Sequence, residues 1–347
     1  MKTPTPAFYL SLFSLCLILS SLLVPLLRKI AYRYSILDKP NQFHKTHQQS
    51  VPYLGGLSIV IPVSTVAIFG IFVFGVDFAQ QFRFISILCP AIIMAIVGLF
   101  DDIRNLSPQL RIIVQSVLAI CTTLYLNFIG ISSSLTGTPL FDSLISIFWL
   151  VGITNAMNFI DNLDGGAAGV TVISSLTLFF LAVFGEQYLI AILSLALVGA
   201  SIGFLFWNVN PARIYLGDSG ALFIGFFLGV ALLQFEPKVE SRFAAVLIPV
   251  FLMALPIIDT SVAVISRILK GKSIFQGGRD HISHRLGSLG FSRRQSASLI
   301  WGLAALFSFL GFLINNLAKA ISFSASLVGL LAMGLLLISF LMLDSDS

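Results

Sequence analysis

The sequence predicts an all-α protein, a polytopic helical bundle that crosses a membrane about eleven times. Three observations favour this fold class. Hydrophobic residues make up 57% of the chain and charged residues only 10%, whereas soluble domains carry about 25% charge. The apolar residues form runs of roughly 20, the length that a helix needs to span hydrocarbon. The segments between these runs are short, so we expect no separate soluble domain.

The apolar runs define the expected spans in order. The first, at 7–27, has only Lys2 before it and Arg28 and Lys29 after it, which indicates a span rather than a cleaved signal peptide. No repeat with a period of roughly 20–50 residues is evident. The other runs predict spans at approximately 54–75, 84–100, 111–129, 140–160, 167–184, 188–207, 219–235, 243–266, 297–316 and 320–343.

Basic residues set the orientation of these spans. With the N-terminus outside, alternation places fifteen Lys and Arg on the inner side and leaves five outside: Lys2, Arg83, Lys238, Arg242 and Lys319. Because cytoplasmic loops carry an excess of Lys and Arg, we expect the N-terminus outside and the C-terminus in the cytoplasm. In this orientation nearly all polar clusters of the chain lie at the inner ends of the spans.

The inner segment 155–166 ends an apolar run, yet it carries amides and carboxylates. On a helix, Asp161 and Asp164 share one face, and Asn158 lies a turn earlier on the same side. Two carboxylates this close repel each other, and their place at the edge of hydrocarbon costs several kcal/mol. A bound cation or a cationic substrate contact would offset that cost.

A second acidic pair, Asp101 and Asp102, ends the third expected span. Adjacent helical residues point about 100° apart, so the pair cannot chelate one ion symmetrically. One carboxylate could serve a metal or a nucleophile while the other orients a neighbour. A solvated helix end paired with Arg104 explains the pair equally well. Arg111 and Gln115, a turn apart in the next span, favour the functional interpretation, because a cation beside hydrocarbon requires an anion.

Asp218 stands at the start of a span, between Gly217 and Gly220. Glycines allow a ligand to approach the backbone, and the amides of a helix N-terminus favour phosphate. The alternative is an ordinary helix cap. Arg213 and Tyr215, just upstream, favour the ligand interpretation, and Tyr215 either stacks on a nucleobase or is an interface aromatic.

The inner loop 270–294 holds six basic residues and two histidines. As a metal site it is weak, because hard Mg²⁺ prefers oxygen ligands. As a pyrophosphate clamp it is better, since arginines such as Arg279 and Arg285 grip phosphate with two donors, and His281 or His284 can donate a proton. The excess of basic residues in inner loops explains the lysines but not the Gly-Gly-Arg-Asp-His run.

Asp259 lies within the ninth expected span. A carboxylate inside a membrane is functional by default, although this one could also brace Arg267 or a helix break at Pro256.

The acidic oxygens, the amides, the basic loop and the glycine-flanked turns suit Mg²⁺-dependent phosphoryl transfer at one membrane face. One substrate would be a soluble diphosphate compound and the other a lipid phosphate.

The motifs, in this order, resemble those of the polyprenyl-phosphate N-acetylhexosamine-1-phosphate transferase family, and the resemblance covers nearly the whole chain. It implies a single membrane-embedded phosphoglycosyl transferase domain over 1–347. The motifs that carry it are Asp38-Lys-Pro-Asn, Pro52-Tyr-Leu-Gly-Gly, Asp101-Asp102, Asn155 to Asp164, Asn208 to Gly220, Pro256-Ile-Ile-Asp259 and Gly278-Arg-Asp-His281-Ile-Ser-His284-Arg285.

The resemblance implies a reaction on the cytoplasmic face of a bacterial plasma membrane. A UDP-N-acetylhexosamine gives its sugar-1-phosphate, with GlcNAc-1-phosphate as the expected group, to undecaprenyl phosphate, and UMP leaves. The lipid-linked product starts a cell-envelope glycan. Mg²⁺ is the implied cofactor, with Mn²⁺ as an alternative. The implied partners are these two substrates and the lipid bilayer, without nucleic acid, and a homodimer is left open.

The resemblance also implies residue roles. Asp101 would deprotonate or position the lipid phosphate with Asp102 beside it, and Asp161 would act near the diphosphate. Asp218 and Asn158 would bind Mg²⁺. The implied substrate contacts, in which Tyr215 stacks on the nucleobase, are Asp164, Asn208, Tyr215, Lys45, His47, Arg111, Arg279, His281, His284 and Arg285.

One departure narrows the substrate. The peptidoglycan branch of the family has a longer run of histidines where this chain reads His-Ile-Ser-His-Arg, which favours a simple UDP-N-acetylhexosamine over UDP-MurNAc-pentapeptide.

The alternative function is a secondary transporter with intramembrane carboxylates. Transporters hold such groups near the midplane, whereas here only Asp259 is expected deep. An inactive scaffold that binds lipid phosphate would leave the costly acids without a purpose.

Overall fold

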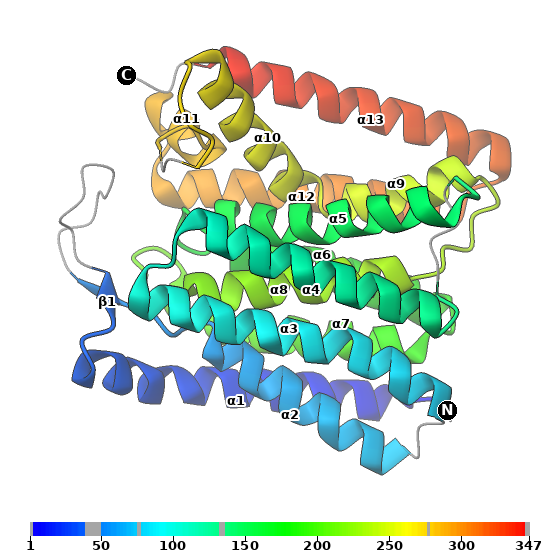
Figure 1. Cartoon of the computed structure of the whole chain (residues 1–347), viewed down its shortest axis with the longest axis horizontal. Coiled ribbons are helices and arrows are strands. Elements are labelled where there is room, and N and C mark those ends of the chain that lie inside the picture. The colour runs from blue at the N-terminus through cyan, green and yellow to red at the C-terminus, as the bar shows by residue number, and fades with distance from the viewer. Residues whose placement is uncertain (1–2, 39–49, 75–77, 132–135, 276–277, 344–347) are drawn as a thin grey trace.

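The computed structural model describes residues 3–38, 50–74, 78–131, 136–275 and 278–343, and this part of the chain is helical apart from one short ribbon (Figure 1). It confirms the all-α fold class. The elements are α1 (Pro6–Arg33), β1 (Leu37–Asp38), β2 (Val51–Pro52), α2 (Leu57–Phe74), α3 (Phe78–Arg104), α4 (Pro108–Phe128), α5 (Pro139–Ile160), α6 (Gly166–Phe184), α7 (Tyr188–Asn208), α8 (Gly217–Gln234), α9 (Arg242–Leu252), α10 (Ala254–Leu269), α11 (Ile282–Ser288), α12 (Arg293–Ile314) and α13 (Lys319–Met342).

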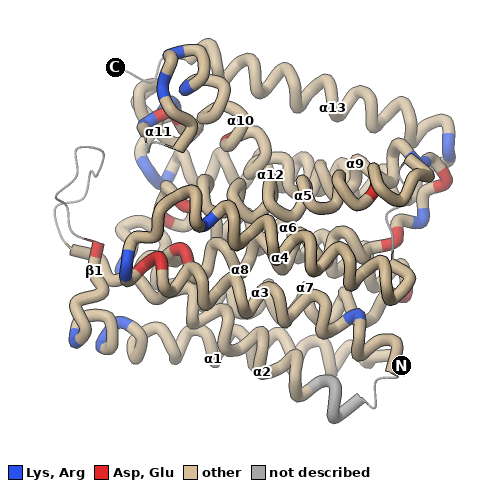
Figure 2. The backbone as a smooth tube through the Cα atoms, in the orientation of Figure 1, with Lys and Arg blue, Asp and Glu red and all other residues tan. Residues whose placement is uncertain are grey.

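Within the described residues, nine helices are long and apolar enough to cross a membrane, and the bent pair α9–α10 makes a tenth candidate. The apolar stretch of α2, Leu57–Phe69, is shorter than a full span. Ten of the eleven expected spans fall on these ten candidates, and the second, at 54–75, falls on α2. Charged residues gather toward the two ends of the bundle, and the middle is almost free of them (Figure 2). The protein is therefore a multi-pass membrane protein.

The ninth expected span, 243–266, is not one straight helix. Helices α9 and α10 meet at Met253 and bend by 75°. Pro256, early in α10, lacks the backbone N–H that would bond to the Leu252 carbonyl. Ser174 Oγ of α6 donates to that carbonyl instead, over 2.6 Å. The bend directs α10 toward the C-terminal end of α5. This end of the bundle, which the basic residues predict to face the cytoplasm, is called the inner end below, and the opposite end is called the outer end.

Helix α8 forms the centre of the bundle. Of its most apolar stretch 89% is buried, against 22% for the peripheral α13. A helix that is apolar on every side has to be surrounded by protein or lipid, and α3 and α5 pack directly against this one. The start of α8, with Asp218, is thereby fixed between the inner ends of α3 and α5.

Two glycines allow the close packing around that start. A Cβ on Gly98 of α3 would collide with the Asp218 carbonyl, and a Cβ on Gly56 would collide with the backbone of Gly220. Because both positions lack a side chain, α3 lies directly against the first turn of α8. The pair Asp101 and Asp102, one turn after Gly98, is therefore held beside Asp218.

The ribbon attaches another segment to the inner end. Strands β1 and β2 pair antiparallel, with Leu37 opposite Pro52. The backbone N–H of Tyr215 donates to the Pro52 carbonyl over 2.9 Å, and the Tyr215 carbonyl accepts from Gly55 over 3.0 Å. The segment before α8 is therefore fastened to the ribbon, and Asp38 of β1 lies near Tyr215.

Candidate active site

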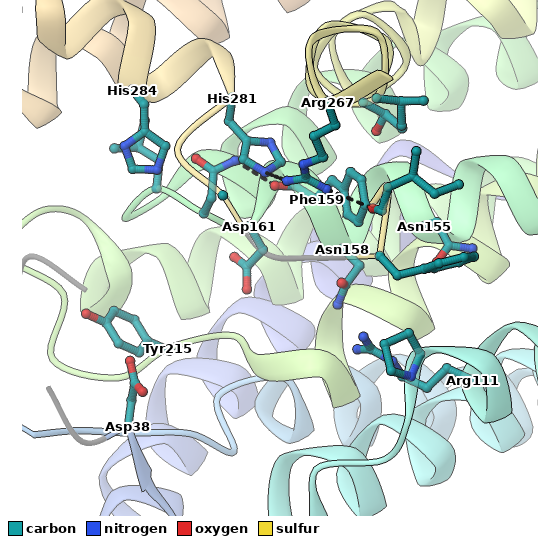
Figure 3. Close-up of a pocket in the computed structure, with 18 of the residues that line it drawn as sticks. Asp38, Arg111, Asn155, Asn158, Phe159, Asp161, Tyr215, Arg267, His281 and His284 are labelled. Atoms are coloured by element: carbon teal, nitrogen blue, oxygen red, sulfur yellow. Dashed lines mark hydrogen bonds between the residues drawn. The ribbon is translucent and has the colours of Figure 1, made fainter. Parts of the chain in front are cut away.

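A cavity of about 530 Å³ lies at the inner end of the bundle. Its walls come from α4, α5, α10, the ribbon, the segment before α8 and the loop around α11 (Figure 3). Motifs that are far apart in the sequence thus meet at one place. The predicted site residues that line the cavity are Arg111, Asn158, Asp161, Asp164, Asn208, Tyr215, His281 and His284.

Arg111 connects two of the predicted aspartates at the cavity edge. Its Nη1 donates to Asp101 Oδ2 over 2.7 Å and to Asp218 Oδ2 over 3.0 Å. Asn158 Nδ2 donates to the other Asp218 oxygen over 2.6 Å, and the Leu106 N–H donates to the other Asp101 oxygen over 2.7 Å. The carboxylate of Asp101 is buried, and its cationic partner is Arg111 from the next helix rather than Arg104.

Asp102 faces the backbone of α8. Its two oxygens accept the N–H groups of Asp218, over 2.9 Å, and Ser219, over 3.1 Å. Gly217, just before them, has a φ of +73°, and a Cβ there would lie 2.8 Å from Asp102 Oδ2. Asp102 therefore caps the first turn of α8 and positions Asp218. Its predicted catalytic role stays a prediction.

Asp161 follows the last residue of α5, and its carboxylate points into the cavity (Figure 3). Burial raises the pKa of Asp161 well above its usual value, and the neighbouring carboxylates Asp218 and Asp102 raise it further. A carboxyl group in this environment takes up a proton near neutral pH more readily than an ordinary aspartate. Among the predicted catalytic residues, Asp161 is the one whose side chain lines the cavity.

Asp164 and Asn208 line the cavity but bind mostly backbone. Asn208 accepts from the Gly165 N–H and donates to the Ile214 carbonyl, both over 2.9 Å. Asp164 Oδ2 accepts from Asn210 Nδ2 over 2.7 Å and from the Ala212 N–H over 3.1 Å. These contacts fix the loop between α7 and α8. The substrate contacts predicted for Asp164 and Asn208 stay predictions.

An aromatic pair forms the wall opposite the α11 loop. The rings of Tyr215 and Tyr53 lie 6.1 Å apart at 51°, and both line the cavity. Burial raises the pKa of both hydroxyl groups, and a nearby carboxylate, Asp164 for Tyr215 and Asp38 for Tyr53, raises it further. Both phenols are therefore neutral at physiological pH, and they offer flat faces and hydrogen-bond donors to a ligand.

The loop before α11 brings His281 to the cavity and holds it in one orientation. His281 Nδ1 lies 2.8 Å from Asp259 Oδ2, and the Ile282 N–H donates to the other oxygen of Asp259 over 2.7 Å. The second ring nitrogen, Nε2, lies 3.5 Å from Arg267 Nη2. Because arginine can only donate and a carboxylate only accept, the proton is on Nδ1. Asp259 thus holds His281 in place. It can do so because the bend between α9 and α10 directs α10 toward the inner end.

Arg267 is a buried cation with several partners. Its Nε donates to Asp280 Oδ2 over 3.1 Å, its Nη1 donates to the Ile274 carbonyl over 3.0 Å, and its guanidinium lies 5.5 Å from the centre of the Phe159 ring. It also lines the cavity. The guanidinium therefore fixes the fold of the inner loop against α5.

The remaining basic residues of this loop differ in position. His284 lines the cavity, and burial lowers its pKa to about 4, helped by the nearby His281 and by the positive charge of Arg279. Arg279 is exposed and lines a smaller neighbouring cavity of about 300 Å³. The structure does not bring Arg285 to either cavity.

Arg285 points instead toward the end of α13. Its Nε donates to the Asp280 carbonyl over 3.0 Å, its Nη2 donates to Ser266 Oγ over 2.9 Å, and its Nη1 donates to the carbonyls of Phe340 and Leu343. The predicted substrate contact of Arg285 finds no counterpart in this position, because its donors bind the protein itself. The predicted contacts Lys45 and His47 lie outside the described residues.

Four charged or tyrosine residues of the cavity wall were not among the predicted site residues: Asp38, Tyr53, Arg267 and Arg293. Asp38 and Tyr53 belong to motifs that were recognised, so every polar or aromatic residue of those motifs should have been a candidate. Arg293, which lies 3.5 Å from Asp164 Oδ1, was counted only as part of a basic loop. Arg267 was considered only as a possible partner of Asp259.

The oxygen atoms of this site fit a hard divalent cation. No group of three or more His, Cys, Asp or Glu side chains converges on a single metal position in the described part of the chain. Mg²⁺ does not need such a cage, because it is usually bound through one or two carboxylates together with water and substrate phosphates. Asp218 and the amide of Asn158, which bond to each other, supply donors of that kind, and Asp161 lies close enough for Asp218 to raise the pKa of Asp161.

Comparison with known proteins identifies the class. The pattern of glycosyl transferase family 4 matches residues 84–236. The probable undecaprenyl-phosphate N-acetylglucosaminyl 1-phosphate transferase of Bacillus subtilis is 33% identical over 89% of this chain and 84% of its own length. The undecaprenyl-phosphate alpha-N-acetylglucosaminyl 1-phosphate transferase of Escherichia coli K12 is 28% identical over 82% of this chain and 78% of its own.

A third relative is the decaprenyl-phosphate N-acetylglucosaminephosphotransferase of Mycolicibacterium smegmatis, 30% identical over 81% of this chain and 76% of its own length. The chain therefore belongs to the polyprenyl-phosphate N-acetylhexosamine-1-phosphate transferase family, within glycosyl transferase family 4. The resemblance that the motifs indicated is confirmed.

Proposed function

We propose that this protein transfers GlcNAc-1-phosphate from UDP-GlcNAc to undecaprenyl phosphate and releases UMP. An oxygen of the lipid phosphate attacks the phosphorus that carries the sugar, and the bond from this phosphorus to the oxygen of UMP breaks, with its electron pair on UMP. The names of the Bacillus subtilis and Escherichia coli relatives support the transferred group and the lipid acceptor. The inner end of the bundle would face the bacterial cytoplasm.

One observation carries this proposal: the bonded cluster of Arg111, Asp101, Asp218 and Asn158 stands at the edge of a cavity large enough for a nucleotide sugar head group. Phosphoryl transfer depends on positioning and on neutralising phosphate oxygens. When bound, Mg²⁺ would supply the neutralising charge, and Asp218 and Asn158 would hold it. Asp102 keeps Asp218 in place through the backbone of α8.

The other cavity residues have roles that fit their contacts. Asp161, whose pKa is raised, would take the proton of the lipid phosphate when this is protonated. Tyr215 and Tyr53 would bind the uracil between the ribbon and α8, since aromatic faces stack on bases. Arg293, together with neutral His284, would bind phosphate or sugar oxygens from the opposite wall.

The transporter alternative receives less support from the fold. A transporter of this kind would keep carboxylates near the middle of the membrane, but the acidic residues lie toward the ends of the bundle (Figure 2). Asp259, the residue expected to be deepest, contacts His281 of the inner loop.

The direct test is a transfer assay with the purified full chain, undecaprenyl phosphate, Mg²⁺ and a panel of UDP-sugars, in which UMP and lipid-linked product are both measured. We expect equal amounts of UMP and product from UDP-GlcNAc, and neither after EDTA. Product from UDP-GalNAc alone would change the assigned sugar to GalNAc and leave the proposed reaction unchanged. Folded protein that gives no product from any UDP-sugar would refute the proposed function.

A further inference from the structure

Arg111 bonds to one oxygen of the Asp218 carboxylate that a metal ion would use. Both oxygens of Asp218 accept a hydrogen bond, one from Asn158 and the other from Arg111. The same nitrogen of Arg111 bonds more closely to Asp101, at 2.7 Å against 3.0 Å for Asp218. The side chain of Asp101 is 6% exposed, whereas those of Arg111 and Asp218 are each 28% exposed. The contact with Asp218 is therefore the longer and the more open of the two.

The surroundings hold more carboxyl groups than one guanidinium can pair with. Asp102 lies behind the first turn of α8 and binds the Asp218 N–H, and Asp161 is close enough to act electrostatically on Asp218 and Asp102. With Asp101 and Asp218, which bond to Arg111 directly, four carboxyl groups lie in this region. Like charges in a partly buried site destabilise one another, so a second positive charge would stabilise the arrangement.

We propose that Arg111 is a resident counter-ion, which a divalent cation displaces from Asp218 while Asp101 retains it at the cavity wall. This inference rests on the metal part of the proposed function. A guanidinium has five N–H donors in a fixed plane, so Arg111 can stay on Asp101 while it gives up Asp218. Since Arg111 lines the cavity, the donors that leave Asp218 then face the space where the phosphates bind.

This exchange explains two features with one residue. Before the ion binds, Arg111 keeps Asp101 and Asp218 from repelling each other, and the inner ends of α3 and α8 stay together. After the ion binds, the same side chain becomes a phosphate-binding cation beside it. A permanent strut would behave differently, because Arg111 would then stay on Asp218 and the ion would have to bind beside the guanidinium.

The two interpretations predict opposite effects on ion affinity, so the test measures binding rather than turnover. Mn²⁺ serves as the probe, because free Mn²⁺ is quantified directly by electron paramagnetic resonance during a titration of the purified full chain. The variants are Arg111→Gln, which removes the charge, and Arg111→Lys, which keeps it. Arg104→Gln is the matched control, because Arg104 is an exposed arginine at the end of α3, on the same side of the bundle.

If Arg111 competes with the ion, Arg111→Gln binds Mn²⁺ about tenfold or more tightly than the wild type, because a positive charge that repels and excludes the ion is gone. Arg111→Lys and Arg104→Gln stay within about threefold of the wild type. Transfer activity of Arg111→Gln falls although its ion affinity rises. Equal or weaker Mn²⁺ binding by folded Arg111→Gln overturns the inference.

Loss of folding in the variant is also informative. If Arg111→Gln unfolds without metal, we expect Mn²⁺ to restore the folded protein, because the ion replaces the missing charge, and failure of Mn²⁺ to do so identifies Arg111 as a strut and overturns the inference. Mn²⁺ binding to neither wild type nor Arg111→Gln would refute the metal part of the proposed function. Binding that is equal in both would refute the exchange and leave the proposed function intact.

Discussion

The two ends of the helical bundle treat charge in different ways. At the outer end, Arg83 and Glu236 form a 3.4 Å ion pair whose side chains are 41% and 72% exposed. At the inner end, the pairs Arg111–Asp101 and Arg267–Asp280 include carboxylates that are only 6% and 7% exposed. Water solvates the outer pair, which contributes about 0–1 kcal/mol. The inner charges persist at a desolvation cost of several kcal/mol, which is the pattern of a functional site.

Asp218→Asn, at the inner end, should cause the largest loss of turnover. The substitution removes a carboxylate charge but keeps the shape of the side chain, so we expect turnover to fall by about 10³-fold while the protein stays folded. Initial rates of UMP release measure this effect, and the matched control at the outer end is Glu236→Gln, with turnover within about twofold of the wild type. Full activity of Asp218→Asn would remove this residue from the reaction.

Asp102→Asn should have the next largest effect. The amide keeps one acceptor oxygen, so one of the N–H groups of Asp218 and Ser219 loses its partner. We expect Asp218 to shift and turnover to fall by about 10²-fold, with about 1 kcal/mol lost from the free energy of unfolding. Thermal unfolding in detergent and initial rates check both effects. A variant with lower activity and unchanged stability would instead indicate direct chemistry at Asp102.

Tyr215→Ala tests the aromatic wall. Loss of stacking should raise KM for UDP-GlcNAc about tenfold, and the KM for undecaprenyl phosphate should stay nearly constant. Tyr215→Phe keeps the ring and should behave almost like the wild type. Unchanged KM for the nucleotide sugar in the alanine variant would rule out stacking on Tyr215.

The smallest effect concerns His284. Burial and nearby positive charges lower its pKa from 6.5 unfolded to about 4 folded. The unfolded chain therefore binds more protons between these values, so the contribution of His284 to stability is complete above pH 6.5 and is lost as the pH falls toward 4. His284→Gln should flatten this pH dependence by about 1 kcal/mol. Thermal unfolding across that pH range measures it, and identical pH profiles would contradict the assignment.

The sequence predicted the fold and the meeting of motifs well, for a physical reason. Long apolar runs have few alternatives to spanning helices, and the distribution of Lys and Arg places Asp101, Asn158, Asp161 and Asp218 at one end. Asp101, Asn158 and Asp218 are joined by hydrogen bonds from Arg111 and Asn158, and the close packing at Gly98 allows this approach. The family resemblance, which the relatives confirm, followed from the same motifs.

The partners of individual polar atoms were beyond the sequence. Asp102 adjoins Asp101, which bonds to Arg111, yet Asp102 caps α8. Arg285 belongs to the motif of the cavity residues His281 and His284, yet it binds the end of α13. Whether a side chain reaches a ligand or a backbone group depends on packing between distant segments, which spacing does not encode. The bend at Met253 is a similar case, because Pro256 indicates a break but gives no angle.

The most direct test of the inner end as the site of the reaction uses sealed membrane vesicles of opposite orientation, with UDP-GlcNAc added outside. This nucleotide does not cross a lipid bilayer, so it reaches only the face that is turned outward. The account predicts lipid-linked GlcNAc in inverted vesicles, where the inner end faces the medium, and almost none in right-side-out vesicles until they are permeabilised. Equal product in sealed vesicles of both orientations would contradict it.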